Sequence, residues 1–258
     1  MTTTVICHFY NEEYLLPWWL MHHVKMFDHG ILIDYNSTDK SVEICRALAP
    51  KWEIRSSRND SFAAESCDAE VMDIERSLTG WKIALNVTEF LCCRHKLNNF
   101  VNIASQNNLH SFATNGVVMV DPLGFYPQPT YVKPLVEQRF YGFFEADNTI
   151  SSVSFQTRNR LLHDFPDGAY LAGRHSYNRG PVYRTNDLML MWFAFSPWTQ
   201  QMIDRKLQIQ NRIPISDKLR GFGRHHLVDD AELEKLRFIE LSKSYDIRKH
   251  PLYVPVTV

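Results

Sequence analysis

The first 90 residues alternate between apolar runs of strand length and amphipathic stretches of helix length. The apolar runs cover residues 3–9, 30–34, 51–56 and 81–87. Between the last two runs, apolar residues recur every three or four positions over 67–78, which is the period of one helical face. Strands that alternate with helices predict an α/β fold with a mainly parallel central sheet.

Length and charge narrow the class of protein. A chain of 258 residues is long enough to bury a sizeable core, and we expect a single domain over residues 1–258. The 28 Lys and Arg residues are balanced by 29 Asp and Glu residues. A nucleic-acid-binding or membrane-surface protein usually carries a basic excess, so we expect no nucleic-acid partner.

The compartment is predicted from the amino terminus and the cysteines. The opening MTTTVICHFYNEE has no basic region followed by a long apolar stretch, and no run reaches the length of a transmembrane segment. The five cysteines are odd in number and have no paired CxxC spacing. We therefore expect a reduced, cytoplasmic protein without a transmembrane segment.

Polar residues follow three of the predicted strands, at 8–12, 34–39 and 86–89. In a parallel sheet, ligands bind beyond the carboxyl ends of the strands. Each of these polar residues alone could equally be a helix cap. Their shared position at one edge of the sheet predicts a ligand site there.

The residues at these strand ends resemble a known family. The segment FYNEEYLLPWWLMHH…FDHGILIDYNSTDKS is similar to the opening of glycosyltransferase family-2-like enzymes with a GT-A fold, whose second strand ends in D-x-x-S-x-D-x-S. The stretch GWKIALNVTEFL resembles the next family element, W-x-x-x-x-D-x-D-E-F-L, with Asn86 and Thr88 in place of the two aspartates. FATNG at 112–116 and EQRF at 137–140 resemble later motifs of the family less closely.

The resemblance implies an activity and an organisation. It implies a glycosyltransferase of glycan biosynthesis, which moves a sugar from a nucleotide-sugar donor to a glycan or other hydroxyl acceptor. Residues 1–120 would form the nucleotide-binding half and residues 121–258 the acceptor-side half. The alternative from another class is a non-catalytic protein of the same fold that binds a nucleotide sugar or a glycan.

The family motif also implies the residues that hold the nucleotide. Tyr35 stands where many members have a second aspartate, and its ring could stack on the base instead. The remaining positions carry carboxylate, amide or hydroxyl groups that hydrogen-bond base and ribose: Asn11, Glu12, Asp34, Asn36, Ser37 and Asp39.

Asn86 and Thr88 make the metal uncertain, because Mg²⁺ and Mn²⁺ prefer anionic oxygen ligands. In one interpretation no metal binds, and the basic residues Arg174, Arg179 and Arg184 cover the diphosphate. In a second, Glu89 and a late histidine, His175 or His226, hold a metal weakly. In a third, catalysis is lost and binding remains. We favour a metal that is absent or weakly held.

A transferase that inverts configuration also needs a general base near the acceptor. Four carboxylates of the second half are candidates: Glu145, Asp147, Asp164 and Asp187. We select Asp187, because it precedes the strongly apolar segment LMLMWFAF. Partial desolvation there would raise the pKa of its carboxyl group.

Overall fold

The computed structural model describes residues 1–124, 126–147, 149, 150, 153, 154, 158–223 and 226–255. Its strands are β1 (Thr3–Phe9), β2 (His29–Asp34), β3 (Glu53–Ser56), β4 (Trp81–Asn86), β5 (Glu89–Cys93), β6 (Ser111–Val120), β7 (Tyr141–Phe144), β8 (Thr149–Ile150), β9 (Val153–Ser154), β10 (Leu161–His163), β11 (Tyr183–Phe195) and β12 (Tyr245–Asp246). Its α-helices are α1 (Leu16–His23), α2 (Ser41–Leu48), α3 (Ala64–Arg76), α4 (Leu97–Gln106), α5 (Gln200–Leu207), α6 (Ile215–Arg220) and α7 (Asp230–Leu241). Short 3-10 turns occur at Leu135–Glu137, Glu145–Asp147, Gln208–Arg212 and Ile247–Lys249.

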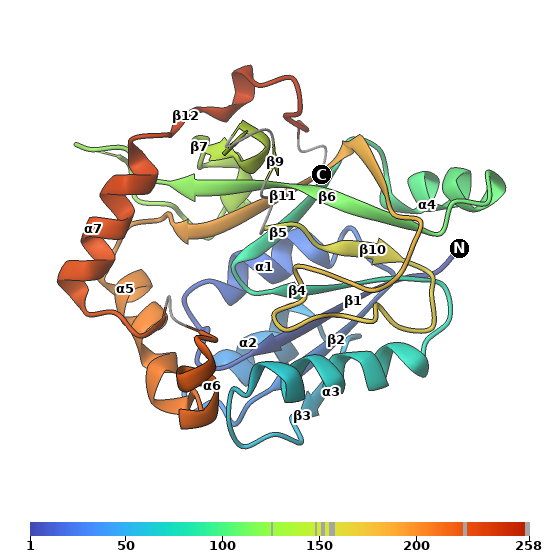
Figure 1. The fold of residues 1–258 in the computed structure, drawn as a ribbon, viewed down its shortest axis with the longest axis horizontal. Coiled ribbons are helices and arrows are strands. Elements are labelled where there is room, and N and C mark those ends of the chain that lie inside the picture. Colours follow the sequence, from blue (N-terminus) through green and yellow to red (C-terminus); the bar gives the residue numbers. More distant parts are fainter. Residues whose placement is uncertain (125, 148, 151–152, 155–157, 224–225, 256–258) are drawn as a thin grey trace.

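Most of the described strands form one large sheet, in which the order is β12-β7-β6-β10-β4-β1-β2-β3. In the same sheet β11 pairs with β5 and β6, whereas β8 and β9 pair with each other in a separate sheet. Its centre is parallel, since β1 pairs in parallel with both β2 and β4, and β2 with β3. The long strands β6 and β11 lie side by side, also in parallel (Figure 1). Antiparallel strands, among them β10 and β7, complete the sheet. The predicted α/β class with a mostly parallel central sheet is confirmed.

Alternate residues of β1 enter the two cores on opposite faces of the sheet, as the pleat of a strand requires. Val5 and Cys7 pack with apolar residues of α1, α2 and α4. Ile6 packs with residues of α3, whose helical stripe over 67–74 was predicted from its spacing. Both faces of the central sheet are therefore covered, which explains why its strands read as continuous apolar runs.

None of the described helices has the length and apolar character needed to span a membrane. All five cysteines are buried as free thiols.

The fourth strand ends one residue earlier than predicted, and a second strand follows it closely. The apolar run at 81–87 was read as one strand, with the polar residues 86–89 at its end. In the structure β4 ends at Asn86, a two-residue turn follows, and Glu89 begins β5. Because β5 pairs with β11 and not with β4, the chain changes direction at this turn. The Glu89 carboxylate consequently faces back to Asn86.

Helix α1 is fixed to β5 by side chains that bond to the backbone of the strand. The Nε2 atom of His22 lies 2.6 Å from the Leu91 carbonyl oxygen, and the Leu91 N–H donates to Nε2 of His23 at 3.2 Å. Trp19 Nε1 donates to the Glu89 carbonyl at 2.9 Å. Since all three side chains are buried, α1 covers the β4–β5 turn closely.

Buried histidines should make the protein sensitive to acid. Burial lowers the pKa of His22 to about 4, below the value of about 6.5 expected in the unfolded chain. The unfolded state therefore binds the additional proton between these two pH values, and stability is lost as pH falls from about 6.5 to about 4. We expect His22 to contribute roughly 3 kcal/mol to this loss, at about 1.4 kcal/mol per pH unit.

Urea denaturation from pH 7.5 to pH 4.5 measures this effect. His22→Gln should be less stable than the parent at pH 7.5 but should lose less stability on acidification. His95→Gln, at an exposed position, is the matched control. If the parent and His22→Gln show the same pH dependence, the acid sensitivity has another source.

Candidate active site

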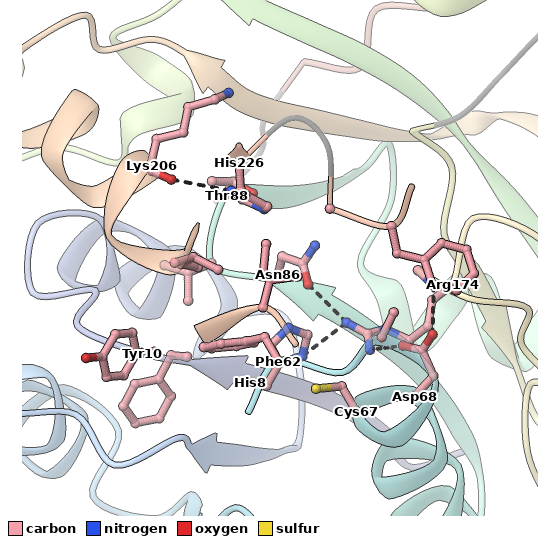
Figure 2. Close-up of a pocket in the computed structure, with 18 of the residues that line it drawn as sticks. His8, Tyr10, Phe62, Cys67, Asp68, Asn86, Thr88, Arg174, Lys206 and His226 are labelled. Carbon is pink, nitrogen blue, oxygen red and sulfur yellow. Dashed lines mark hydrogen bonds and ion pairs between the residues drawn. The ribbon is translucent and has the colours of Figure 1, made fainter. Parts of the chain in front are cut away.

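A cavity of about 250 Å³ lies beyond the carboxyl ends of β1 and β4 (Figure 2). His8, Phe9 and Tyr10 line it from β1, and residues 86–88 line it from the turn after β4. Its remaining walls come from α3, the loop at 173–175, β11, α5, residues 209–223 and His226. Residues of two of the three predicted strand ends, 8–12 and 86–89, thus line one cavity, whereas residues 34–39 do not.

A buried guanidinium occupies the floor of this cavity. Arg174 is 3% exposed and forms an ion pair with Asp68 of α3. Its Nη2 atom donates to the side-chain oxygen of Asn86 and to Nδ1 of His8, each at 3.0 Å (Figure 2). Asp68 also accepts the Gly173 N–H at 2.7 Å, which fixes the loop that carries the arginine. The Nε atom of Arg174 is buried without a partner among the described residues.

The contact with Arg174 determines the state of His8. Burial, then Arg174 and Arg160, lower the pKa of His8 well below its usual value, so the imidazole is neutral at pH 7. Arg174 always donates, so Nδ1 of His8 is the acceptor and Nε2 carries the proton. His8 is therefore a hydrogen-bond donor at Nε2.

Glu89 is engaged by a second buried arginine. Arg160 Nε donates to one carboxylate oxygen at 2.8 Å and Nη2 to the other at 2.6 Å. The Asn86 N–H donates to the same carboxylate at 2.8 Å. Both side chains are almost fully buried, so this bidentate pair is shielded from water.

These contacts test whether the residues at this edge fit a divalent cation. Asn86 and Thr88 offer neutral oxygens, and the Glu89 carboxylate is bonded to Arg160. His175 lines the cavity but accepts from Arg160 Nη1 at 3.2 Å. His226 lines another wall, where Nδ1 lies 3.3 Å from the Lys206 carbonyl oxygen. Among the described residues no three His, Cys, Asp or Glu side chains form a group suited to a metal ion.

The donor set at this edge therefore does not match the metal site of the family that the sequence resembles. The neighbouring His225, part of the late histidine pair, lies outside the described residues. The predicted ligands Glu89, His175 and His226 each have their own partners and do not converge.

Most of the predicted nucleotide residues hold two loops together. Asp34 accepts the Ser37 N–H at 2.9 Å, and Ser37 Oγ accepts the Asn11 N–H at 3.1 Å. Asp39 accepts the N–H groups of Ser41 and Glu13, at 2.9 and 3.0 Å. These contacts join the loop after β1 to the loop after β2. Asn36, with φ of 59°, adopts the left-handed conformation in the same turn.

Tyr35 has a structural position that the sequence did not predict. Its side chain is fully buried, its hydroxyl lies 3.1 Å from Glu70, and its ring stacks on Phe62 at 4.8 Å between centroids. Tyr35 is therefore not free to stack on a base. Phe62 and Tyr10 line the cavity in its place, with the Arg212 guanidinium over both rings.

The other predicted site residues lie away from the cavity. Arg179 pairs with Asp167, and Arg184 lies on an exposed part of β11. Asp187 forms a partly exposed ion pair with Arg94 at 3.2 Å and does not line the cavity. Of the three arginines predicted to cover a diphosphate, only Arg174 lines the cavity.

The carboxylates that line the cavity are each engaged. Glu12 binds Arg205 through both oxygens, and burial raises its pKa against the opposing effect of that arginine. Asp68 pairs with Arg174. Asp217 pairs with Arg220 at 2.8 Å and accepts the Ala64 N–H. Among the described lining residues, no carboxylate is left as an obvious general base.

Several residues that line the cavity were not among the site residues predicted from the sequence. His8 and Tyr10 could have been found, because they lie in the polar stretch that ends the first strand. Asp68 follows a residue of the predicted helical stripe, so its position on the side of the helix that faces the sheet could have been inferred. Lys206 and Trp192 carried no sequence signal, because nothing local relates them to the amino-terminal strands.

The chain matches no known family model and no curated protein. Among solved structures, TarS from S. aureus in complex with UDP-GlcNAc aligns at 12% identity and a TM-score of 0.42, over 94% of this chain and 72% of that chain. In another TarS structure, at 14% identity and a TM-score of 0.34, the match covers 50% of this chain and only 23% of the other.

A third similar structure is glucosyl-3-phosphoglycerate synthase from Mycobacterium tuberculosis, in complex with Mn²⁺, UDP and glucosyl-3-phosphoglycerate. It aligns at 16% identity and a TM-score of 0.31, over 45% of this chain and 44% of that chain. At these scores and identities, the likenesses by themselves carry no argument about activity.

The position of Asp39 generates a prediction. Asp39→Ala removes the acceptor of two backbone N–H groups and should lower the free energy of unfolding by roughly 1–3 kcal/mol. Asp39→Asn retains one carbonyl oxygen and should lose less. Urea denaturation measures the stability, and nucleotide affinity is measured on the same variants. If a variant keeps its stability but loses nucleotide affinity, Asp39 binds the nucleotide, as predicted from the sequence.

Proposed function

We propose that this chain is a glycosyltransferase that uses a nucleotide sugar, and that the donor enters the cavity beyond β1 and β4. The single observation that carries the proposal is the Arg174 guanidinium, held by Asp68, Asn86 and His8 at the carboxyl ends of two parallel strands. This is the edge of an α/β sheet at which ligands bind. A cation fixed there suits a phosphate-bearing ligand.

Each wall of the cavity suits a different part of such a donor. Tyr10 and Phe62 form an aromatic wall against which a base can pack. Arg174 would lie against the diphosphate, with the Nε2–H of His8 as a further donor. The cavity is slightly smaller than the range of about 300–1,000 Å³ typical of small-molecule sites. The sugar and acceptor would therefore extend toward its mouth.

In this proposal the protein's own cation stabilises the leaving diphosphate. Negative charge accumulates on the diphosphate as the glycosidic bond breaks, and a guanidinium already in place stabilises that charge without reorganisation. Asp68 and Asn86 hold the guanidinium in a fixed orientation. No step is assigned to a metal, because the donor atoms at this edge do not fit one.

A second candidate function is binding without catalysis. It is favoured by one observation, that the lining carboxylates Glu12, Asp68 and Asp217 are all held by arginines. A protein with this cavity could bind a nucleotide sugar or a glycan and transfer nothing.

Donor hydrolysis distinguishes the two candidates. We expect one of UDP-, GDP-, CDP- or dTDP-sugars to raise the melting temperature, because a ligand that binds only the folded state stabilises it. With the donor so identified, a transferase should slowly hydrolyse it, so that the sugar passes to water and the nucleoside diphosphate is released. The release should be rapid when an acceptor is supplied. Binding without release under either condition supports the second candidate, and the absence of any binding contradicts both.

Arg174 provides a direct test of the proposed site. Arg174→Ala with Asp68→Asn removes the cation without leaving a buried unpaired carboxylate. We expect roughly tenfold or more loss of affinity for the nucleoside diphosphate, since a charge-assisted hydrogen bond contributes about 1.5–3 kcal/mol. Affinity for the nucleoside alone should change little.

Arg179→Ala is the matched control, because it removes an arginine that lies outside the cavity. Titration calorimetry with and without EDTA measures the affinities, and a fixed cation should make EDTA nearly without effect in the parent. If the Arg174 variant loses equal affinity for the nucleoside and for the nucleoside diphosphate, the diphosphate does not bind at Arg174.

A further inference from the structure

Most of the positive charge around the cavity is already neutralised. The lining residues Arg174 and Arg205 pair with Asp68 and Glu12. Arg160, which contacts Gly173 and His175 of the wall, pairs with Glu89. Burial and neighbouring arginines lower the pKa of His175, so this histidine adds no charge at pH 7. Further net attraction for an anionic ligand therefore requires a cation that no carboxylate neutralises.

Two further cations share one aromatic ring instead of pairing with a carboxylate. The Arg158 guanidinium lies 3.9 Å from the centroid of the Trp192 ring. Lys206 of α5, only 6% exposed, has its Nζ atom 5.7 Å from the same centroid and 4.3 Å from that of Phe195. Trp192 and Lys206 line the cavity. Figure 2 shows the Lys206 side chain directed away from the cluster around Arg174.

Neither cation has an ion-pair partner among the described residues. The Nε atom of Arg158 is buried without a hydrogen bond, while its backbone N–H donates to Glu145 at 2.6 Å. The residues outside the described part include no Asp or Glu, so no carboxylate side chain is missing from this account. Glu145, Glu89 and Glu240 act on Arg158, and Glu240 on Lys206, only at longer range.

Two like charges in a poorly hydrated region are unfavourable unless an anion compensates them. Burial, then Arg205 and Arg158, lower the pKa of Lys206 to about 7, against the opposing effect of Glu240. Aromatic rings stabilise a cation by about 0.5–2 kcal/mol, which does not replace a counterion. A negative group that binds here would therefore favour the protonated, charged form of Lys206.

We propose that Arg158, Lys206 and Trp192 form an oxyanion subsite of the cavity, which binds a phosphate or diphosphate group. The guanidinium and the ammonium would donate to the phosphate oxygens, and Trp192 holds both cations in place. The phosphate has two possible sources: the diphosphate of the donor, or a phosphate carried by the acceptor. Assignment to the donor rests on the proposed function, whereas the subsite itself does not.

Inorganic pyrophosphate is the probe that tests the subsite without assuming a nucleotide. We expect it to bind the parent protein and to bind Lys206→Met and Arg158→Met about tenfold more weakly, or worse, as expected when a charge-assisted contact is lost. Lys235→Met, which removes the same charge from an exposed position of α7, is the matched control and should bind like the parent. Titration calorimetry at constant ionic strength measures the affinities.

Thermal unfolding separates this role from a structural one. Without an anion, Lys206→Met should melt at the same temperature as the parent or higher, because an uncompensated cation is gone. With pyrophosphate, the parent should gain more in melting temperature than the variant. A parent that does not bind pyrophosphate, or equal pyrophosphate affinities in the parent and both variants, would overturn the proposal. A lowered melting temperature with unchanged affinity would show that Lys206 only packs.

Competition identifies the source of the phosphate. If pyrophosphate and UDP, GDP, CDP or dTDP exclude each other, and both lose affinity in Lys206→Met, the subsite holds the donor diphosphate. If the nucleotide binds the parent and Lys206→Met equally, and pyrophosphate binds beside it, the subsite holds an acceptor phosphate. Both results support the subsite. If no nucleotide binds at all while pyrophosphate does, the proposed function fails and the subsite remains.

Discussion

The buried pair between Glu89 and Arg160 is the contact on which the site depends. The Glu89 carboxylate accepts from the Asn86 backbone and so sets the turn between β4 and β5. Arg160 also donates to the Gly173 carbonyl and to His175, which fixes the loop that carries Arg174. The removal of one partner from a buried ion pair typically costs about 3–5 kcal/mol, because the other charge is left unpaired. This pair therefore joins the amino-terminal strands to the loop from the second half.

Asn86 at the end of β4 joins this pair to Arg174. Asn86 offers its amide oxygen to Arg174 and its backbone N–H to Glu89. A guanidinium needs an acceptor of this kind, and it supplies a positive charge without the several anionic ligands that a dication requires. Under the proposed function, the cation is part of the protein. The cavity would then bind phosphates with arginine and lysine side chains at two separate places.

Local periodicity made the amino-terminal half predictable. β1 has the predicted bounds, and the stripe at 67–74 lies on α3, because burial of one helical face or of a whole strand leaves a repeating pattern in the sequence. The turn at 87–88 was missed, since an apolar run gives no sign that its pairing partner changes from β1 to β11. Tyr35 was assigned to the ligand site because the position in a motif does not reveal which way a side chain points.

The sequence by itself determined the α/β alternation and the polar strand ends, because both follow from contacts between near neighbours in the chain. The tertiary structure alone decided which charges are paired. Arg174 reaches Asp68 across 106 positions, and Arg205 reaches Glu12 across 193. Only the closure of such long loops brings the partners within hydrogen-bond distance, so no local pattern records it. For the same physical reason, the folded chain alone shows that Arg158 and Lys206 meet at Trp192, with no ion-pair partner for either among the described residues.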